Sequence, residues 1–278
     1  LNEQQKRAVA AGPGPVLVLA GPGSGKTRVL TYRIAYLIAV MGVQPYQILA
    51  VTFTNKAARE MESRVAGLLG GRADGLWLGT FHRICGRILR REAAYLPVDH
   101  NFVIFDSDDQ LSLVKRVIKE MRLNEKDYRP HQVHARISKA KNDLMGPDEF
   151  PIEGYRDEVI AEIYKAYQGY LIASNAMDFD DMLLYTAILL DTNPEVRKKY
   201  AQRFTHILVD EFQDTNLAQY FLLSHLASFH KNIFVVGDED QSIYRWRGAD
   251  YHNVEKFVID FPDAEKILLE QKIGRAHV

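Results

Sequence analysis

Cysteine is almost absent from this sequence, and so are long apolar runs. The 278 residues include a single cysteine, Cys85, which excludes an internal disulfide or a cysteine-rich zinc site and fits a reducing cytoplasm. The longest apolar stretches, 16–20 and 34–43, are too short to span a bilayer, and no amino-terminal signal segment is visible. The sequence therefore predicts a soluble, cytoplasmic protein that does not associate with a membrane.

Neither sign of charge is in excess. The 35 lysines and arginines nearly balance the 36 aspartates and glutamates, so binding to a polyanion must depend on local basic patches and not on net charge. Apolar residues make up 47% of the chain, which is enough for a packed core. The length allows two domains, or one domain with a large insertion.

The sequence does contain short apolar runs, and helical patterns separate them. Most of the runs are continuously apolar, which is typical of parallel strands covered on both faces. They lie at 16–19, 48–52, 77–78, 207–209, 233–236 and 267–269. Helical periodicity separates them, for example at 28–41 and 56–69, so we expect an α/β fold with a doubly wound parallel sheet.

Polar segments follow five of these runs. Their sequences are AGPGSGKT, FTNKAA, GTFH, DEFQDT and GDEDQ. Because the ligands of such sheets lie beyond the carboxyl ends of the strands, this convergence predicts a functional site at that edge of the sheet.

The first of these segments fits the P-loop pattern, with alanine at its first position. It follows a predicted strand and opens a predicted helix, which is the context that the motif requires. Lys26 would reach the β- and γ-phosphates, and the Thr27 hydroxyl would hold Mg²⁺. The residues predicted to bind the nucleotide are Ala20, Gly21, Pro22, Gly23, Ser24, Gly25, Lys26 and Thr27. The alternative is a glycine-rich turn before a helix.

Two carboxylates, Asp210 and Glu211, follow the run at 207–209. We assign Asp210 to the Mg²⁺ shell and Glu211 to the general base that takes a proton from attacking water. Acidic residues are common at strand ends, so this assignment depends on the presence of the P-loop.

The block between these two motifs predicts an insertion. Lys26 and Asp210 lie 184 positions apart (210 − 26), which is long for one uninterrupted P-loop domain. Within the block, Asp106 and Ser107 precede apolar residues at helical spacing. The predicted division is a sheet domain at 1–91, a mostly helical insertion at 92–195 and the rest of the sheet domain at 196–271.

Together these motifs resemble the UvrD/Rep/PcrA family of superfamily-one DNA helicases. The matching segments are LNEQQKRAV, AGPGSGKTRVLTYRIAYL, AVTFTNKAAREM, GTFHRICGRILR, DFDDML, ILVDEFQDTN and VVGDEDQSIYRWRGAD, in the family's order. The resemblance implies a RecA-like motor domain (1A) interrupted by a helical subdomain (1B). It also implies ATP-driven 3′ to 5′ translocation on single-stranded DNA and unwinding of duplex DNA in repair or replication. A monomer at the bacterial nucleoid is expected.

The resemblance also assigns residues around the nucleotide and the DNA. Gln5 corresponds to the amide that reads the adenine edge, Arg28 lies near the nucleotide, and Gln241 corresponds to the γ-phosphate sensor that orients water. The DNA-contacting positions are Phe53, Thr54, Asn55, Thr80, His82, Phe179, Tyr244, Trp246 and Arg247. Aromatic rings would stack on bases, and short polar groups would hold phosphates. Core packing is the alternative for the aromatic residues, Phe179 included.

Basic side chains in and beside the insertion could form a track for the DNA backbone. They are Arg83, Arg87, Arg90, Arg91, Lys139 and Lys141. The alternative is an ordinary solvated helix face.

After residue 271 the sequence departs from the family pattern. The family continues with a second motor domain, whereas 272–278 resembles a non-native tail. We therefore expect the partner to be that missing domain, and this fragment to bind nucleotide weakly, hydrolyse ATP barely and unwind nothing. Two other readings stay open: the motor part of a recombination helicase–nuclease, and a single-strand-binding module with a vestigial P-loop.

Overall fold

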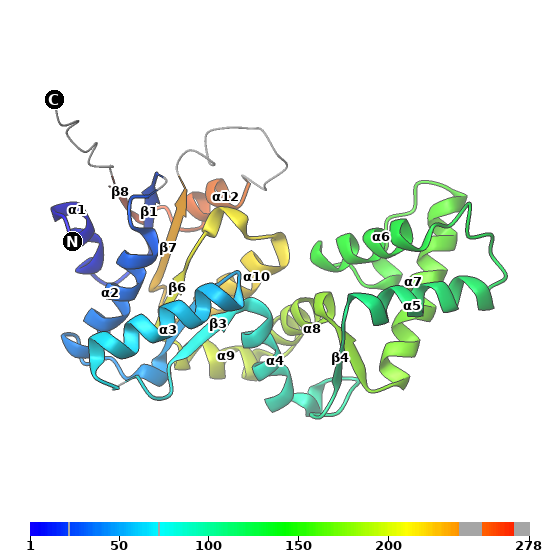
Figure 1. Cartoon of the computed structure of the whole chain (residues 1–278), viewed down its shortest axis with the longest axis horizontal. Helices are drawn as coiled ribbons and strands as arrows, with labels where there is room; N and C mark the ends of the chain where they lie inside the picture. The colour runs from blue at the N-terminus through cyan, green and yellow to red at the C-terminus, as the bar shows by residue number, and fades with distance from the viewer. Residues whose placement is uncertain (22, 72, 239–251, 270–278) are drawn as a thin grey trace. The chain divides into compact units, whose positions relative to one another are not determined.

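A parallel sheet lies at the centre of the first of two structural units (Figure 1). The computed structural model describes residues 1–21, 23–71, 73–238 and 252–269. The sheet unit comprises Leu1–Ile84, Arg197–Asn216 and Leu223–Val278, and the helical unit comprises Cys85–Val196 and Leu217–Leu222. The boundaries predicted from the sequence, at 91/92 and 195/196, stay predictions.

Six strands form the sheet in the order β3-β2-β6-β7-β1-β8, and every paired neighbour is parallel. Their bounds are β1 Val16–Ala20, β2 Ile48–Thr52, β3 Trp77–Thr80, β6 His206–Val209, β7 Ile233–Asp238 and β8 Glu265–Leu269. Each predicted run lies in one of these strands, so the α/β fold with a parallel sheet is confirmed. Strand β7 is longer than predicted, because Gly237 and Asp238 continue its pairing with β1.

Helices cover the sheet and supply its core. They are α1 Glu3–Val9, α2 Lys26–Ala39, α3 Asn55–Leu69 and α12 His252–Asp260. Helix α2 buries Val29, Leu30, Ile34 and Leu37, which recur at the spacing of one helix face. Every residue of β2 and β7 is buried, which explains why both runs lack the polar–apolar alternation of a half-exposed strand.

Four helices make up most of the described helical unit: α5 Ser107–Glu120, α6 Pro130–Asn142, α7 Tyr155–Ala173 and α8 Phe179–Thr192. Asp106 caps α5 by accepting hydrogen bonds from the next turn, as the sequence suggested. A two-stranded parallel sheet, β4 Val103–Phe105 with β5 Ala176–Asp178, was not predicted, because three-residue strands leave almost no pattern.

Shorter elements complete the described chain. They are the helices α4 Phe81–Arg91, α9 Pro194–Arg203 and α10 Leu217–Leu226, and the 3₁₀ turns η1 Pro45–Gln47, η2 Ala93–Tyr95, η3 Pro147–Glu149 and η4 Phe212–Asp214. No helix in the described ranges is both long enough and apolar enough to cross a membrane.

A charge cluster is buried inside the helical unit. The Lys141 ammonium is fully buried and lies 2.7 Å from a carboxylate oxygen of Asp178 and 2.8 Å from one of Asp181. The Tyr167 hydroxyl donates to Asp178 at 2.8 Å, and the Gln168 amide donates to Asp181 at 3.0 Å. The prediction that Lys141 belongs to an exposed basic track is therefore wrong, since its charge is neutralised in the interior.

Candidate active site

The P-loop connects β1 to α2, as predicted. Gly23 and Gly25 have φ angles of 73° and 86°, in the left-handed region that favours glycine. Gly25 is the N-cap of α2 and has no side chain to cap it, so the first N–H groups of the helix are available to an anion. The Ser24 hydroxyl is buried and has no hydrogen-bond partner among the described residues. Pro22 lies outside the described residues.

Gln5 reaches this loop from the start of α1. Its side-chain oxygen accepts from the Asn2 backbone N–H, and Asn2 in turn accepts from the Gln5 N–H, so a capping box fixes the turn. The Gln5 amide donates to the Ser24 carbonyl at 2.8 Å. A β-carbon on Gly25 would stand 2.9 Å from the Gln5 amide nitrogen, so this contact requires glycine there. The predicted adenine-reading residue is thus attached to the phosphate loop.

Lys26 lies between two carboxylates from neighbouring strands. Its Nζ is 3.1 Å from Glu211 Oε2 and 3.4 Å from Asp238 Oδ2, and its side chain is 13% exposed. Burial alone would lower the pKa of Lys26, but the hydrogen bond and charge of Glu211, with the charge of Asp238, raise it above its ordinary value. The ammonium therefore stays positive in the site.

Thr27 and Asp210 form a second pair of oxygen groups beside Lys26. The Thr27 hydroxyl donates to Asp210 Oδ2 at 3.3 Å. Asp210 is 2% exposed, and burial together with the charge of Glu211 raises its pKa to about 6. A nearby cation would favour its charged form.

Glu211 follows in a strained backbone conformation. Its φ is 47°, in the left-handed region that non-glycine residues rarely adopt. Its backbone N–H donates to Asp210 Oδ1 at 3.0 Å, and its side chain accepts from Lys26 and from the Gln213 amide. Both adjacent carboxylates lie at the same sheet edge, where Lys26 contacts Glu211 and Thr27 contacts Asp210.

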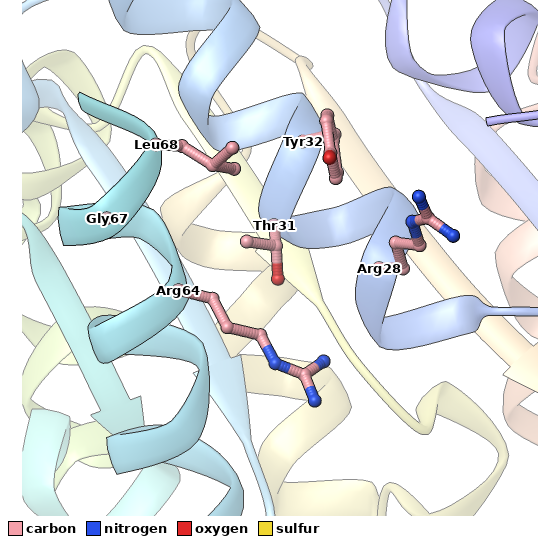
Figure 2. Close-up of a pocket in the computed structure, with 6 residues that line it drawn as sticks. All are labelled: Arg28, Thr31, Tyr32, Arg64, Gly67 and Leu68. Carbon is pink, nitrogen blue, oxygen red and sulfur yellow. The ribbon is translucent and has the colours of Figure 1, made fainter.

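A cavity of about 420 Å³ opens between α2 and α3. Figure 2 shows Arg28 and Tyr32 on α2 and Arg64 extending from α3 on the other side of Thr31. The Arg28 guanidinium lies 5.7 Å from the Tyr32 ring centroid. Arg64, which also pairs with Glu60, was not predicted as a site residue, because an arginine on a helix face carries no local signal of its place.

The predicted DNA-contacting residues of the sheet unit follow the adjacent strands β2 and β3. The half-buried Phe53 packs against Phe81, with ring centroids 5.6 Å apart. Thr54 caps α3, and Asn55 is exposed in its first turn. Thr80 is 8% exposed and its hydroxyl accepts the Arg83 N–H at 3.2 Å, so its side chain has a capping role here. His82 is half-buried. Their contact with DNA stays a prediction.

The structure describes some of the remaining predicted positions but not others. Phe179 is 42% exposed at the start of α8, so the alternative that it lies in the core is wrong. Gln241, Tyr244, Trp246, Arg247 and the tail at 272–278 lie outside the described residues. The arginines of the proposed track, Arg83, Arg87, Arg90 and Arg91, are exposed on α4, and Lys139 is exposed on α6.

The chain is similar in sequence to known proteins. Residues 1–262 match the family described as UvrD/REP helicase N-terminal domain. The chain is 51% identical over 273 residues to "ATP-dependent DNA helicase PcrA" of Bacillus subtilis. It is 48% and 47% identical over the same length to the proteins of that name from Staphylococcus aureus and Staphylococcus epidermidis. In each case the match covers 98% of this chain and 37% of the relative.

Proposed function

Because the chain belongs to the UvrD/REP helicase N-terminal domain family, we propose that it is the ATPase and DNA-binding part of an ATP-dependent DNA helicase. One observation carries the proposal. Lys26 and Thr27, which begin the helix after β1, contact Glu211 and Asp210, which follow β6. A lysine, a hydroxyl and two carboxylates at one sheet edge are the groups that phosphoryl transfer to water requires.

The triphosphate would occupy the P-loop. The N–H groups and positive dipole end of α2 would hold the phosphates, and the buried Ser24 hydroxyl would gain a partner there. Gln5 would read the adenine edge from α1, where its amide is bonded to the loop, and Arg28 also lies close to Gly25 of the loop. Arg64, which lines the same cavity from α3, supplies a further positive charge.

Mg²⁺ fits the oxygen groups that are present. Hard oxygen ligands suit this ion, and the Thr27 hydroxyl and Asp210 carboxylate are 3.3 Å apart. When bound, Mg²⁺ would neutralise charge on the phosphate oxygens. Asp210 and Thr27 are the residues that would hold it.

Hydrolysis would then proceed from Glu211. Its carboxylate takes one proton from a water molecule, whose oxygen forms a bond to the γ-phosphorus. The bond between the γ-phosphorus and the β,γ-bridging oxygen breaks, leaving ADP and inorganic phosphate. Lys26 stabilises the charge on the phosphate oxygens, and Gln241 is proposed to orient the water.

DNA would lie along the ends of β2 and β3. Phe53, Thr54, Asn55, Thr80 and His82 follow two strands that are paired in register, which supports one continuous contact surface. We propose that Tyr244, Trp246 and Arg247 also contact DNA, and that Phe179 is a DNA contact of the helical unit. The whole protein would move 3′ to 5′ on single-stranded DNA as a monomer at the bacterial nucleoid, with a second motor domain completing the ATP site and 92–195 as the 1B insertion.

Binding of a fluorescent ATP analogue to this chain tests the ATP site. With Mg²⁺ present, Lys26→Ala should weaken binding at least tenfold, since a charge-assisted contact to phosphate is lost, roughly 1.5–3 kcal/mol. Lys6→Ala is the matched control, because the Lys6 side chain is 59% exposed on α1 and pairs with Glu3 one turn away. Equal affinity of wild type and Lys26→Ala would favour a strand-binding module with a vestigial P-loop.

A further inference from the structure

Four side chains and one backbone group at the sheet edge form a closed ring of hydrogen bonds. Lys26 Nζ contacts Glu211 Oε2 at 3.1 Å, and the same oxygen accepts from Gln213 Nε2 at 2.8 Å. Gln213 Oε1 accepts from the Asp238 backbone N–H at 3.0 Å, and the Asp238 carboxylate returns to Lys26 at 3.4 Å. The ring joins the ends of β1, β6 and β7.

The chemistry of its neighbours fixes the orientation of the Gln213 amide. A carboxylate such as Glu211 can only accept, and a backbone N–H can only donate, so the NH₂ group must face Glu211 and the carbonyl must face Asp238. Gln213 is 5% exposed, and the space around it is tight, since a β-carbon on Gly237 would stand 3.2 Å from Gln213 Oε1. The amide cannot turn without losing both contacts.

Glu211 depends on this amide for its position. Its side chain is 36% exposed, and its carboxylate accepts hydrogen bonds from Lys26 and from Gln213. In the proposed function Lys26 is directed to the phosphates, so the contact with Gln213 is the one that persists while Glu211 takes the proton. The other end of the amide is anchored on β7, a buried strand in the middle of the sheet.

We propose that Gln213 is a positioning residue that holds the Glu211 carboxylate against the end of β7 during ATP hydrolysis. The proposal rests on the proposed function of Glu211 as the base. It assigns to Gln213 no contact with the nucleotide, so Gln213 affects the rate of the chemical step and not the binding of ATP.

The test is a double-mutant cycle in the complete protein that contains this chain, with single-stranded DNA at saturation. Gln213→Met removes both hydrogen bonds at similar volume, and should lower kcat for ATP roughly 10- to 100-fold with KM nearly unchanged, the range for losing a hydrogen bond to a charged group. In the Glu211→Gln background, the same change should cause no further loss, because the base through which Gln213 acts is gone.

Two further variants keep the result interpretable. Gly237→Ala displaces the Gln213 amide without removing it, and should cause part of the kcat loss expected of Gln213→Met. This variant replaces Gln213→Met in the test if thermal unfolding shows that Gln213→Met folds poorly. Gln213→Glu keeps an acceptor for the Asp238 N–H but repels the Glu211 carboxylate. Gln202→Glu, at an exposed position, is the control for the added charge.

The outcomes separate the inference from the proposed function. Wild-type kcat in Gln213→Met, or losses that multiply in the double variant, would overturn the positioning role while leaving Glu211 as the base. Normal turnover in Glu211→Gln alone would overturn the proposed base itself.

Discussion

Replacing Lys141 by methionine should destabilise the helical unit by about 3–5 kcal/mol, the range for removing one partner of a buried ion pair. The Lys141 ammonium is fully buried and donates to Asp178 at 2.7 Å and to Asp181 at 2.8 Å. Two charge-assisted hydrogen bonds, at roughly 1.5–3 kcal/mol each, give a similar sum. Methionine preserves most of the volume of the stem, so the loss comes from two carboxylates that remain without a cation.

The electrostatics of the cluster support this magnitude. Burial raises the pKa of Asp181 to about 6 even though the Lys141 charge opposes the shift. Without Lys141 at least one carboxyl would have to take up a proton on folding. The double variant Lys141→Met with Asp181→Asn should therefore recover part of the stability, because it removes one of the two unpaired carboxylates.

Urea unfolding at pH 7, followed by circular dichroism and by amide hydrogen exchange in α6, measures the effect. Lys139→Met is the matched control, since Lys139 lies on the same helix with its side chain 75% exposed and pairs with Asp143. Its cost should stay within about 1 kcal/mol, as for other exposed pairs. If Lys141→Met costs no more than Lys139→Met, the cluster does not stabilise the unit as argued.

Two more predictions concern the sheet unit. Burial, with the charge of Arg33, lowers the pKa of His206 to about 4, so the unfolded state binds more protons and this residue's contribution to stability is lost as pH falls from about 6.5 to 4. An NMR titration checks this, with His206→Gln to assign the resonance, and a midpoint near 6.5 would contradict it. Gly25→Ala should weaken ATP binding at least tenfold, because the β-carbon strains a φ of 86° and displaces Gln5. Gly12→Ala, with open space around it, is the control for the fluorescent-analogue assay, and equal affinities would refute the argument.

The fold and the nucleotide loop were predictable because their signals are contiguous in the chain. Runs such as 48–52 are apolar throughout when both faces of a strand are covered, and β2 is buried along its whole length. The P-loop and the pair Asp210 and Glu211 directly follow strands, so their place at the sheet edge follows from chain direction alone.

Other features depend on contacts between distant segments. Lys141 was expected at the surface, in a basic track or on a solvated helix face, because a lysine on a helix is usually solvated. Only the packing of α6 against the start of α8 turns it inward. Arg64 was missed for a related reason: its place across the cavity from Arg28 depends on how α3 lies against α2. The two three-residue strands of the helical unit are too short to give a period.

Local residue patterns thus specified the elements, the phosphate loop and the carboxylates that follow β6. The strand order β6-β7-β1 decided which of their side chains meet. That order brings Asp238 to Lys26, 212 positions away, and lets Gln213 bridge Glu211 to β7. Strand order depends on burial over the whole sheet, so no short segment of the sequence predicts the hydrogen-bonded ring of Lys26, Glu211, Gln213 and Asp238.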